Sequence, residues 1–131
     1  MWAVDTNVLV RALTGDDPQQ SPAAEAFFRA HGPAWVSHLV LVETVWVLDS
    51  VYDRTKLEVC KALTRILDNR MLALEEPNVV RAALALYRSK GKMNFEDCMI
   101  LEIARKAGHL PLATFHKALG KAAGGHLVGG Q

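Results

Sequence analysis

The chain has 131 residues, and its composition, 50% hydrophobic and 22% charged, is that of an ordinary soluble globular protein. Fifteen Lys and Arg residues against 14 Asp and Glu residues leave a net charge of +1, which excludes a polybasic protein that binds nucleic acid by bulk charge. A local basic patch is compatible with this balance. We expect a single domain over residues 1–131, long enough to bury about two thirds of its unfolded surface.

Nothing in the sequence is typical of a secreted or membrane protein. Cys60 and Cys98 are too few for a disulfide scaffold and lack the spacing of zinc ligands. Asp5 stands where a signal peptide needs basic and apolar residues. The longest apolar stretch, residues 36–48, is interrupted by polar residues and is shorter than the roughly 20 residues of a membrane span. We expect a cytoplasmic protein without membrane contact.

An apolar run and two capping sites predict the first elements. Residues 2–4 predict a buried strand, and Asp5 can cap a helix over residues 6–13. Ser21 followed by Pro22 predicts the N-cap and first residue of a second helix, which ends before a glycine–proline pair.

Strands and helices then alternate to the end of the chain. Strands are expected at residues 35–36, 71–74, 112–114 and 126–128, and helices at 38–50, 55–68, 77–89 and 95–107. Short apolar strands separated by helices predict an α/β fold with a mostly parallel sheet. In this class of fold, reactive residues usually lie beyond the carboxyl ends of the strands.

One acid lies on the apolar side of the last long helix. On a helical wheel of residues 95–107, Asp97 falls on the side of Ile100, Leu101, Ala104 and Ala107. A carboxylate that points inward is costly unless it is paired or binds a cation. The alternative is an acid near solvent in the first helical turn, where the helix dipole favours it.

A second acid, Glu43, lies in a helix that is apolar nearly all round. Such a helix is buried on most sides, so Glu43 is expected to be largely buried or to lie at a cleft. The alternative is a structural ion pair with an Arg or Lys.

A third acid, Asp5, directly follows the first predicted strand. It can be the N-cap of the next helix or a ligand at the carboxyl end of the strand, and the two roles are compatible. Asn7 can hydrogen-bond the same carboxylate or serve as a turn residue. Three carboxylates brought close repel one another unless a cation is present, and oxygen ligands select hard ions such as Mg²⁺ or Mn²⁺. A metal site of this kind can hydrolyse phosphodiester bonds.

The acids lie in four segments whose order along the chain carries a resemblance. The segments are Val4–Arg11, Val36–Glu43, Phe95–Ile100 and Leu112–Lys117. Together they resemble the PIN-domain nuclease family, especially the VapC-type toxins of type II toxin–antitoxin pairs. The resemblance covers nearly the whole chain.

The resemblance implies a fold, a site and partners. The fold is a three-layer α/β/α sandwich with a mostly parallel central sheet, and the activity is metal-dependent endoribonuclease cleavage. VapC-type toxins are usually homodimers, neutralised by a small antitoxin protein. The implied metal-binding acids are Asp5, Glu43 and Asp97, with Thr6, Asn7 and Thr114 as supporting polar residues.

Two positions depart from the family pattern. His116 stands where Asp usually follows the Thr114–Phe115 pair, and Asn94 occupies a position that is often acidic. The lost negative charge weakens the case for a tightly bound second metal ion. His116 could ligate Mn²⁺, bind a phosphate or transfer a proton as a catalytic residue, or it could mark a loss of activity.

Basic residues gather in the second half of the chain. Residues 88–121 hold seven Lys and Arg residues against three Asp and Glu residues, a net charge of +4. The best candidates to hold RNA phosphates are Lys90, Lys92 and Lys117, with Arg11 on the first helix. The alternative for any one of them is an ordinary solvated side chain.

Three functions follow from these residues. The first is a Mg²⁺- or Mn²⁺-dependent ribonuclease toxin, indicated by Asp5, Glu43 and Asp97. The second is a degenerate PIN-fold module that binds RNA or protein without cutting, indicated by Asn94 and His116. The third, a phosphatase-like hydrolase with Asp5 as nucleophile, is less favoured because no second aspartate follows two residues later.

Overall fold

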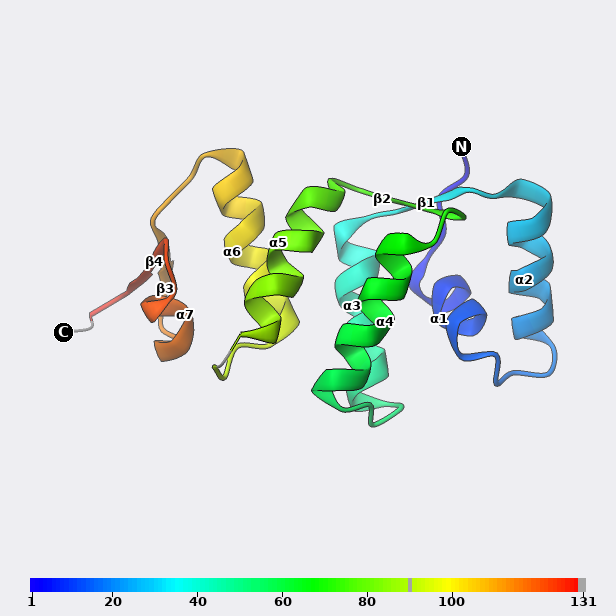
Figure 1. The fold of residues 1–131 in the computed structure, drawn as a ribbon, viewed down its shortest axis with the longest axis horizontal. Helices are drawn as coiled ribbons and strands as arrows, with labels where there is room; N and C mark the ends of the chain where they lie inside the picture. The colour runs from blue at the N-terminus through cyan, green and yellow to red at the C-terminus, as the bar shows by residue number, and fades with distance from the viewer. Residues whose placement is uncertain (90, 130–131) are drawn as a thin grey trace. The chain divides into compact units, whose positions relative to one another are not determined.

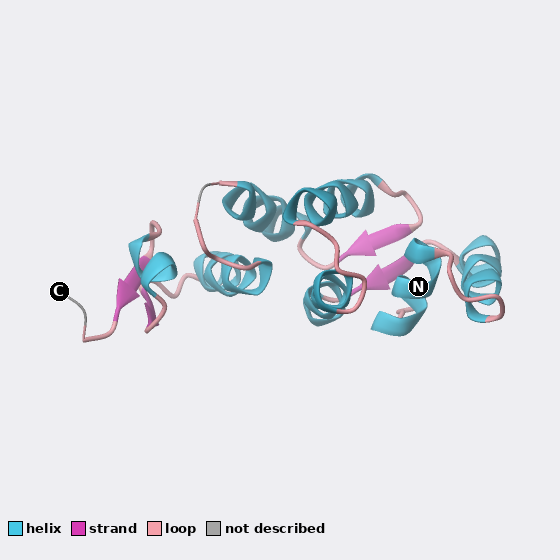
Figure 2. Ribbon diagram, turned by 90° about the horizontal axis from the view of Figure 1, so that it is seen from below, coloured by secondary structure: helices cyan, strands magenta, loops and turns pink. Residues whose placement is uncertain are grey.

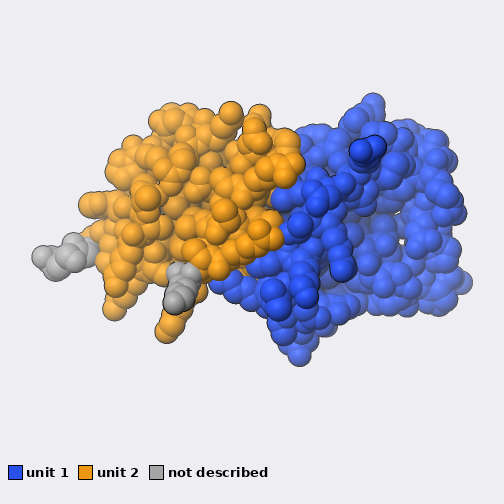
Figure 3. Space-filling view, viewed as in Figure 1, with its two compact units in different colours: residues 1–75 blue, residues 76–131 orange. Residues whose placement is uncertain are grey.

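The computed structural model describes residues 1–89 and 91–129 (Figure 1). The chain divides into two compact units, Met1–Glu75 and Glu76–Gln131, which are called unit 1 and unit 2 (Figure 3). Each unit has its own pair of parallel strands and its own buried side chains, so each is described by itself.

Unit 1 begins with two helices that pack against each other, α1 (Thr6–Thr14) and α2 (Gln20–His31). Asp5 caps α1, because its Oδ1 accepts a hydrogen bond from the backbone N–H of Val8 at 3.0 Å. Gly15 ends α1 at φ 64°, a left-handed conformation that glycine adopts without steric cost.

The predicted N-cap of α2 at Ser21 is wrong. The helix starts two residues earlier, at Gln20 instead of Pro22. The acceptor at its start is Asp17 Oδ1, which accepts hydrogen bonds from the backbone N–H groups of Gln19 at 2.9 Å and Gln20 at 2.6 Å. Ser21 is buried, and its hydroxyl donates to the carbonyl of Arg11 at 2.7 Å. The serine hydroxyl therefore joins α2 to α1 instead of capping its own helix.

Two strands and one isolated bridge form the sheet of unit 1. β1 (Ala34–Val36) pairs in parallel with β2 (Leu72–Leu74), and Figure 2 shows the two arrows side by side in one direction. Ala3 makes a parallel bridge to Trp35, at the N-terminal approach to α1.

The prediction of a buried strand at residues 2–4 is wrong in its burial. Val4 is buried, but Ala3 is exposed and the Trp2 side chain is 57% exposed. Trp2 packs against the rings of Phe27 and His31 on α2, with centroid separations of 5.6 and 4.7 Å. An apolar run alone does not reveal that only one of its side chains is covered.

The remaining helices of unit 1 each begin after a capping side chain. α3 (His38–Ser50) starts where Ser37 Oγ accepts from the backbone N–H of Val40, and α4 (Lys56–Asp68) starts with a capping box between Thr55 and Glu58. Leu41 of α3 and Leu63 of α4 are fully buried, and each such side chain contributes roughly 1.5–3 kcal/mol to folding.

Unit 2 is built on two packed helices, α5 (Pro77–Arg88) and α6 (Phe95–Ala107). The Phe95 ring meets Tyr87 of α5 edge to face, with a centroid separation of 5.8 Å. The predicted apolar face of α6 is wrong in part, because Ile100 is 45% exposed whereas Cys98 is buried. The helix carries two overlapping apolar sets, and a helical wheel does not show which of them the neighbouring helix covers.

The end of unit 2 is a second parallel strand pair. β3 (Leu112–Thr114) pairs with β4 (Gly125–Leu127), which begins one residue before the predicted strand. Between them lies α7 (Lys117–Lys121), a helix too short for periodicity to predict. Arg105 donates from Nη2 to the carbonyl of Ala123 at 2.6 Å and so joins α6 to this pair.

The predicted α/β class with parallel strands is confirmed, because both strand pairs among the described residues are parallel. Cys60 and Cys98 are both buried, and neither forms a disulfide within the described residues. Within the described residues, no helix is long and apolar enough to cross a membrane.

Candidate active site

Polar residues follow each parallel segment of unit 1 at its carboxyl end. Asp5 follows the bridged segment, Ser37 follows β1, and Glu75 follows β2. Glu75 Oε1 accepts the backbone N–H of His38 at 2.8 Å, and Ser37 caps the same helix, α3. The carboxyl edge of this sheet therefore presents oxygen atoms, as expected of a parallel α/β arrangement.

Asp5 keeps one carboxylate oxygen free for another partner. Its Oδ1 accepts the N–H of Val8, and its Oδ2 has no hydrogen bond among the described residues. Asp5 itself is exposed. The N-cap role is thus present, and it leaves a charged oxygen at the start of α1 where a ligand can reach it.

The next residue, Thr6, joins the start of α1 to Glu43 on α3. Thr6 Oγ1 donates to Glu43 Oε2 at 3.3 Å, across 37 residues of sequence. The packing of α1 against α3 makes this bond possible. Two of the three acids singled out in the sequence, Asp5 and Glu43, therefore belong to one place in unit 1.

Of the two positions expected for Glu43, largely buried or at a cleft, the buried one is wrong, because the residue is exposed. The buried face of α3 consists of Leu41, Thr44, Val45 and Leu48, which share one side of the helix. Glu43 lies on the opposite side with Trp46, which is 63% exposed. The described residues place no Arg or Lys in an ion pair with Glu43, so the alternative of a structural ion pair is not seen there either.

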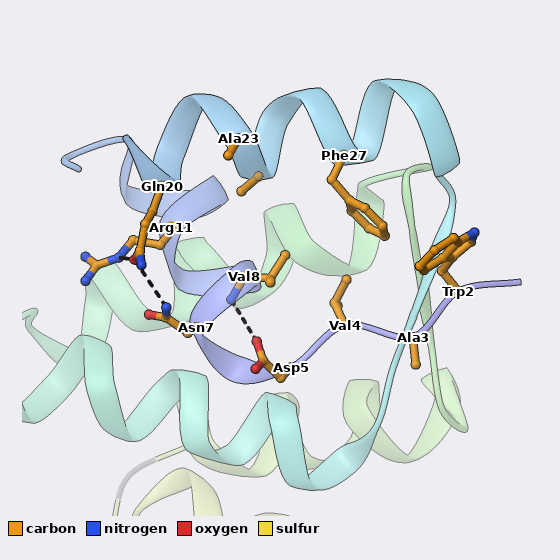
Figure 4. Close-up of a pocket in the computed structure, with 11 residues that line it drawn as sticks. Trp2, Ala3, Val4, Asp5, Asn7, Val8, Arg11, Gln20, Ala23 and Phe27 are labelled. Atoms are coloured by element: carbon orange, nitrogen blue, oxygen red, sulfur yellow. Dashed lines mark hydrogen bonds between the residues drawn. The ribbon is translucent and has the colours of Figure 1, made fainter. Parts of the chain in front are cut away.

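A pocket of about 570 Å³ adjoins Asp5 between the N-terminal segment, α1 and α2 (Figure 4). Trp2 and Phe27 supply apolar walls, and Asn7 and Arg11 are polar residues that also line it. The Asn7 side chain donates to Gln20 Oε1 at 3.2 Å, so its amide nitrogen is directed to α2.

Arg11 shares the same acceptor and has further partners. Its Nε donates to Gln20 Oε1 at 2.8 Å, and its Nη1 donates to the Tyr52 hydroxyl at 3.3 Å. Asp16 lies 3.6 Å from Nη1. Gln20 therefore organises both Asn7 and Arg11, and no local sequence signal identifies it because it lies on another helix.

Asp97 in unit 2 is half-buried in the first turn of α6. It forms a capping box with Asn94: Asn94 Oδ1 accepts the Asp97 N–H at 2.8 Å, and Asp97 Oδ2 accepts the Asn94 N–H at 3.3 Å. Oδ1 of Asp97 has no hydrogen bond among the described residues. Asp97 is thus a helix-start acid, and its Oδ1 takes no part in the capping box.

Both departures from the family pattern are helix caps. Asn94 caps α6, and His116 caps α7 through Nδ1, which accepts the Leu119 N–H at 3.3 Å. Thr114 Oγ1 accepts the His116 N–H at 3.0 Å and holds this turn. An acid at either position would also cap, so the replacements keep the local fold and remove charge.

The basic candidates lie mostly in unit 2. Lys92 is exposed in the loop before α6, and Lys117 is exposed as the first residue of α7. Lys90 lies outside the described residues. Unit 2 has eight Lys and Arg residues against four Asp and Glu residues, a net charge of +4.

The candidate ligands are divided between the units, two in unit 1 and Asp97 in unit 2. Within either unit, the described His, Cys, Asp and Glu residues form no group of three that could hold a metal ion. The candidate donors are carboxylate oxygens, together with the Thr6 hydroxyl in unit 1 and the Thr114 hydroxyl in unit 2. Oxygen donors of this kind suit Mg²⁺ or Mn²⁺.

Comparison with known protein families identifies the fold. The family model described as the PIN domain matches residues 3–125, and so takes in Asp5, Glu43, Asp97 and Thr114. The chain belongs to the PIN domain family. PIN domains are nucleases and generally use divalent metal ions. The resemblance seen in the sequence to this family is confirmed.

One solved structure is similar to this PIN domain at low identity. It is VapC20 of Mycobacterium tuberculosis, described as a toxin that cleaves the sarcin–ricin loop. The two chains are 18% identical with a TM-score of 0.46, over 97% of this chain and 98% of that chain. No curated protein sequence matches this PIN domain significantly.

Proposed function

We propose that this PIN domain is a metal-dependent endoribonuclease, the toxin of a toxin–antitoxin pair. The observation that carries the proposal is the hydrogen bond from Thr6 to Glu43, which brings two predicted metal-binding acids to the start of α1. Membership of a nuclease family supports the reaction class. We also propose that both units form one PIN-like domain, since the family match runs across their boundary.

In this proposal Asp5, Glu43 and Asp97 hold Mg²⁺ or Mn²⁺. Asp5 and Asp97 each keep one oxygen free of hydrogen bonds among the described residues, and Glu43 is exposed. A bound divalent ion supplies Lewis-acid stabilisation of the charge that develops on the reacting phosphate. Thr6 orients Glu43, and the α1 cap fixes the Asp5 carboxylate.

His116 and Thr114 act from the turn between β3 and α7. Because His116 Nδ1 accepts a hydrogen bond from Leu119, the neutral ring carries its proton on Nε2. His116 is exposed, so Nε2–H can donate to a phosphate oxygen or take part in proton transfer. Thr114 positions His116 through its hydroxyl.

RNA is the proposed substrate, held by Lys90, Lys92 and Lys117. The positive charge of unit 2 supports this role, because Lys and Arg side chains bind phosphates without regard to sequence. Arg11 is a weaker candidate, since its guanidinium already bonds Gln20 and Tyr52.

The proposed partners are a small antitoxin and a second copy of the chain, both within the cytoplasm. The VapC-type resemblance supports both, since these toxins pair with antitoxins and are usually homodimers. Co-expression with the neighbouring gene product, followed by size-exclusion chromatography, tests them. A stable complex that blocks RNA cleavage supports the pairing, and a protein that is monomeric and unaffected by that product contradicts it.

The second candidate function is a PIN-fold module that binds RNA or protein without cutting. One observation favours it: Asn94 and His116 preserve the caps of α6 and α7 while lacking the charge of an acid. A site that has lost catalysis is expected to keep its local fold while losing some of the negative charge that binds a metal ion.

The test is cleavage of a structured RNA pool by purified protein in EDTA, Mg²⁺ or Mn²⁺, after removal of any co-purified partner. Asp5→Asn, Glu43→Gln and Asp97→Asn are compared with the parent, because each amide preserves an acceptor and removes the charge. Metal-dependent cleavage that all three variants lose supports the nuclease. Binding without cleavage by the parent supports the second function.

A further inference from the structure

Phe115 stands out among the aromatic residues of the chain. Its side chain is 82% exposed, whereas Tyr87 and Phe95 of the same unit are packed together in unit 2. Single exposed apolar side chains are common, so exposure alone has no functional meaning. The position matters more, because Phe115 lies between Thr114 and His116, two residues assigned to the proposed site.

The backbone around Phe115 is held on both sides. Thr114 Oγ1 accepts the His116 N–H at 3.0 Å, and the Thr114 carbonyl accepts the Val128 N–H at 2.8 Å. The His116 carbonyl accepts the Gly120 N–H at 2.9 Å. A ring presented from such a fixed turn loses little further backbone freedom when it binds a partner.

The charge of the surroundings selects the kind of partner. Phe115 lies in unit 2, which has a net charge of +4, and the exposed Lys117 follows it by two residues. Trp46 is also exposed, at 63%, but it lies beside Glu43 in unit 1, whose net charge is −3. An aromatic ring with lysines nearby matches unpaired RNA, which offers base faces to stack and phosphates to neutralise.

We propose that Phe115 is a stacking platform for one unpaired base of the RNA substrate. The ring binds the face of the base, and Lys117 binds a backbone phosphate. Because any base has a face to stack, Phe115 selects single-stranded over double-stranded RNA and is indifferent to sequence. This inference rests on the proposed function but assigns a residue that the metal chemistry does not use.

The experiment measures binding in EDTA, so that no RNA is cut. Affinity for a fluorescent single-stranded RNA is compared for the parent and for Phe115→Ala, Phe115→Leu and Phe115→Trp. We expect Phe115→Ala and Phe115→Leu to weaken binding by roughly 5- to 100-fold and Phe115→Trp to preserve it. Trp46→Ala is the matched control, an exposed aromatic in the acidic unit, and is expected to change nothing.

A second arm uses RNA in which single nucleotides are made abasic. At the stacked position, the loss of the base should remove the difference between the parent and Phe115→Ala. The proposal is overturned if Phe115→Ala or Phe115→Leu binds RNA as tightly as the parent does. It is also overturned if no abasic position removes the difference in affinity between the parent and Phe115→Ala. An unchanged RNA affinity combined with lost antitoxin binding would assign Phe115 to a protein partner instead.

The two proposals fail in different ways. Cleavage by the parent together with unchanged binding by Phe115→Ala would overturn the stacking role and leave the nuclease standing. Binding that depends on Phe115 without any metal-dependent cleavage would overturn the nuclease and leave the stacking role. A parent that binds no RNA would overturn both.

Discussion

Unit 1 and unit 2 carry opposite charge. Residues 1–75 contain seven Lys and Arg residues against ten Asp and Glu residues, a net charge of −3, and residues 76–131 have a net charge of +4. Unit 1 contributes Asp5 and Glu43, joined through Thr6. Unit 2 contributes Asp97, with caps at Asn94 and His116 that carry no formal negative charge.

The difference in charge suits the two units to different proposed roles, cation binding in unit 1 and phosphate binding in unit 2. Nearby lysines would weaken the binding of a cation by acids, and nearby acids would weaken the binding of phosphates by lysines. The net charge of the whole chain does not reveal the acidic and basic units, because their opposite charges nearly cancel. The net charge of +1 therefore excludes binding by bulk charge and says nothing against a local RNA surface.

The largest effect is expected from removing the charge of Asp5. Asparagine is as good an N-cap as aspartate, so Asp5→Asn should change the free energy of unfolding by less than about 0.5 kcal/mol. If Asp5 holds the metal as proposed, cleavage should fall by roughly a hundred-fold or more. Rates from single-turnover cleavage and urea unfolding curves check the two parts. A variant that cuts RNA at the parental rate would contradict the proposed role of Asp5 as a metal ligand.

The bond between Thr6 and Glu43 tests the role of unit 1 more finely. Thr6→Val keeps the shape of the side chain and removes the hydroxyl that donates to Glu43. Cleavage should fall by roughly 10- to 100-fold with a raised metal requirement, as for other groups that orient a ligand. Thr6→Ser is the control, and it should restore both. Equal metal titrations for Thr6→Val and the parent would show that the hydroxyl does not position Glu43.

His116 tests the missing charge of unit 2. His116→Asp and His116→Asn both keep an acceptor for the cap of α7, but only the first adds a carboxylate. We expect His116→Asp to tighten the apparent Mg²⁺ affinity by roughly tenfold, and His116→Asn to leave it near the parental value. Equal Mg²⁺ titrations for the two variants would place the added charge away from the metal.

The lysines of unit 2 should govern the salt dependence of RNA binding. Lys92→Gln and Lys117→Gln are each expected to weaken binding by several-fold and to make the negative slope of log affinity against log salt shallower by about 0.7. Lys61→Gln, an exposed lysine of unit 1, removes the same charge and should leave the slope unchanged. Slopes measured by titration at several salt concentrations distinguish a local phosphate contact from an effect of net charge.

The smallest effect concerns acid and is expected in unit 1. The Thr14 hydroxyl and then the Tyr52 hydroxyl lower the pKa of Asp16, and the backbone N–H groups of Gln20 and Gln19 lower the pKa of Asp17. A carboxyl whose folded pKa is lowered stabilises the protein above its unfolded pKa, and this contribution is lost as the pH falls through the folded value.

As the pH falls below about 4, the protection of backbone amides against hydrogen exchange should therefore decrease at the loop between α1 and α2 before it decreases in unit 2. Asp17→Asn keeps the acceptor without the charge, and should flatten this pH dependence. This account would be contradicted if amide protection decreased at the same pH in both units, in the parent and in Asp17→Asn alike.

Local hydrogen bonds explain which parts of the fold are predictable from the sequence. Asp5 and Ser37 cap helices by accepting from N–H groups three residues away, so residue type and spacing suffice to predict where α1 and α3 begin. Ser21 fails because two acceptors compete for the start of α2, and Asp17 takes the role. The five residues of α7 are too few to show a period.

The site shows the same division. The four ordered segments that contain Asp5, Glu43, Asp97 and Thr114 suffice to recognise the PIN domain family, because their residue types and order can be read directly from the chain. Exposure of Glu43, the bond from Thr6 and the sharing of Gln20 by Asn7 and Arg11 depend on how helices pack. Such contacts join residues far apart in the chain, and no local preference encodes which face of an apolar helix is left uncovered.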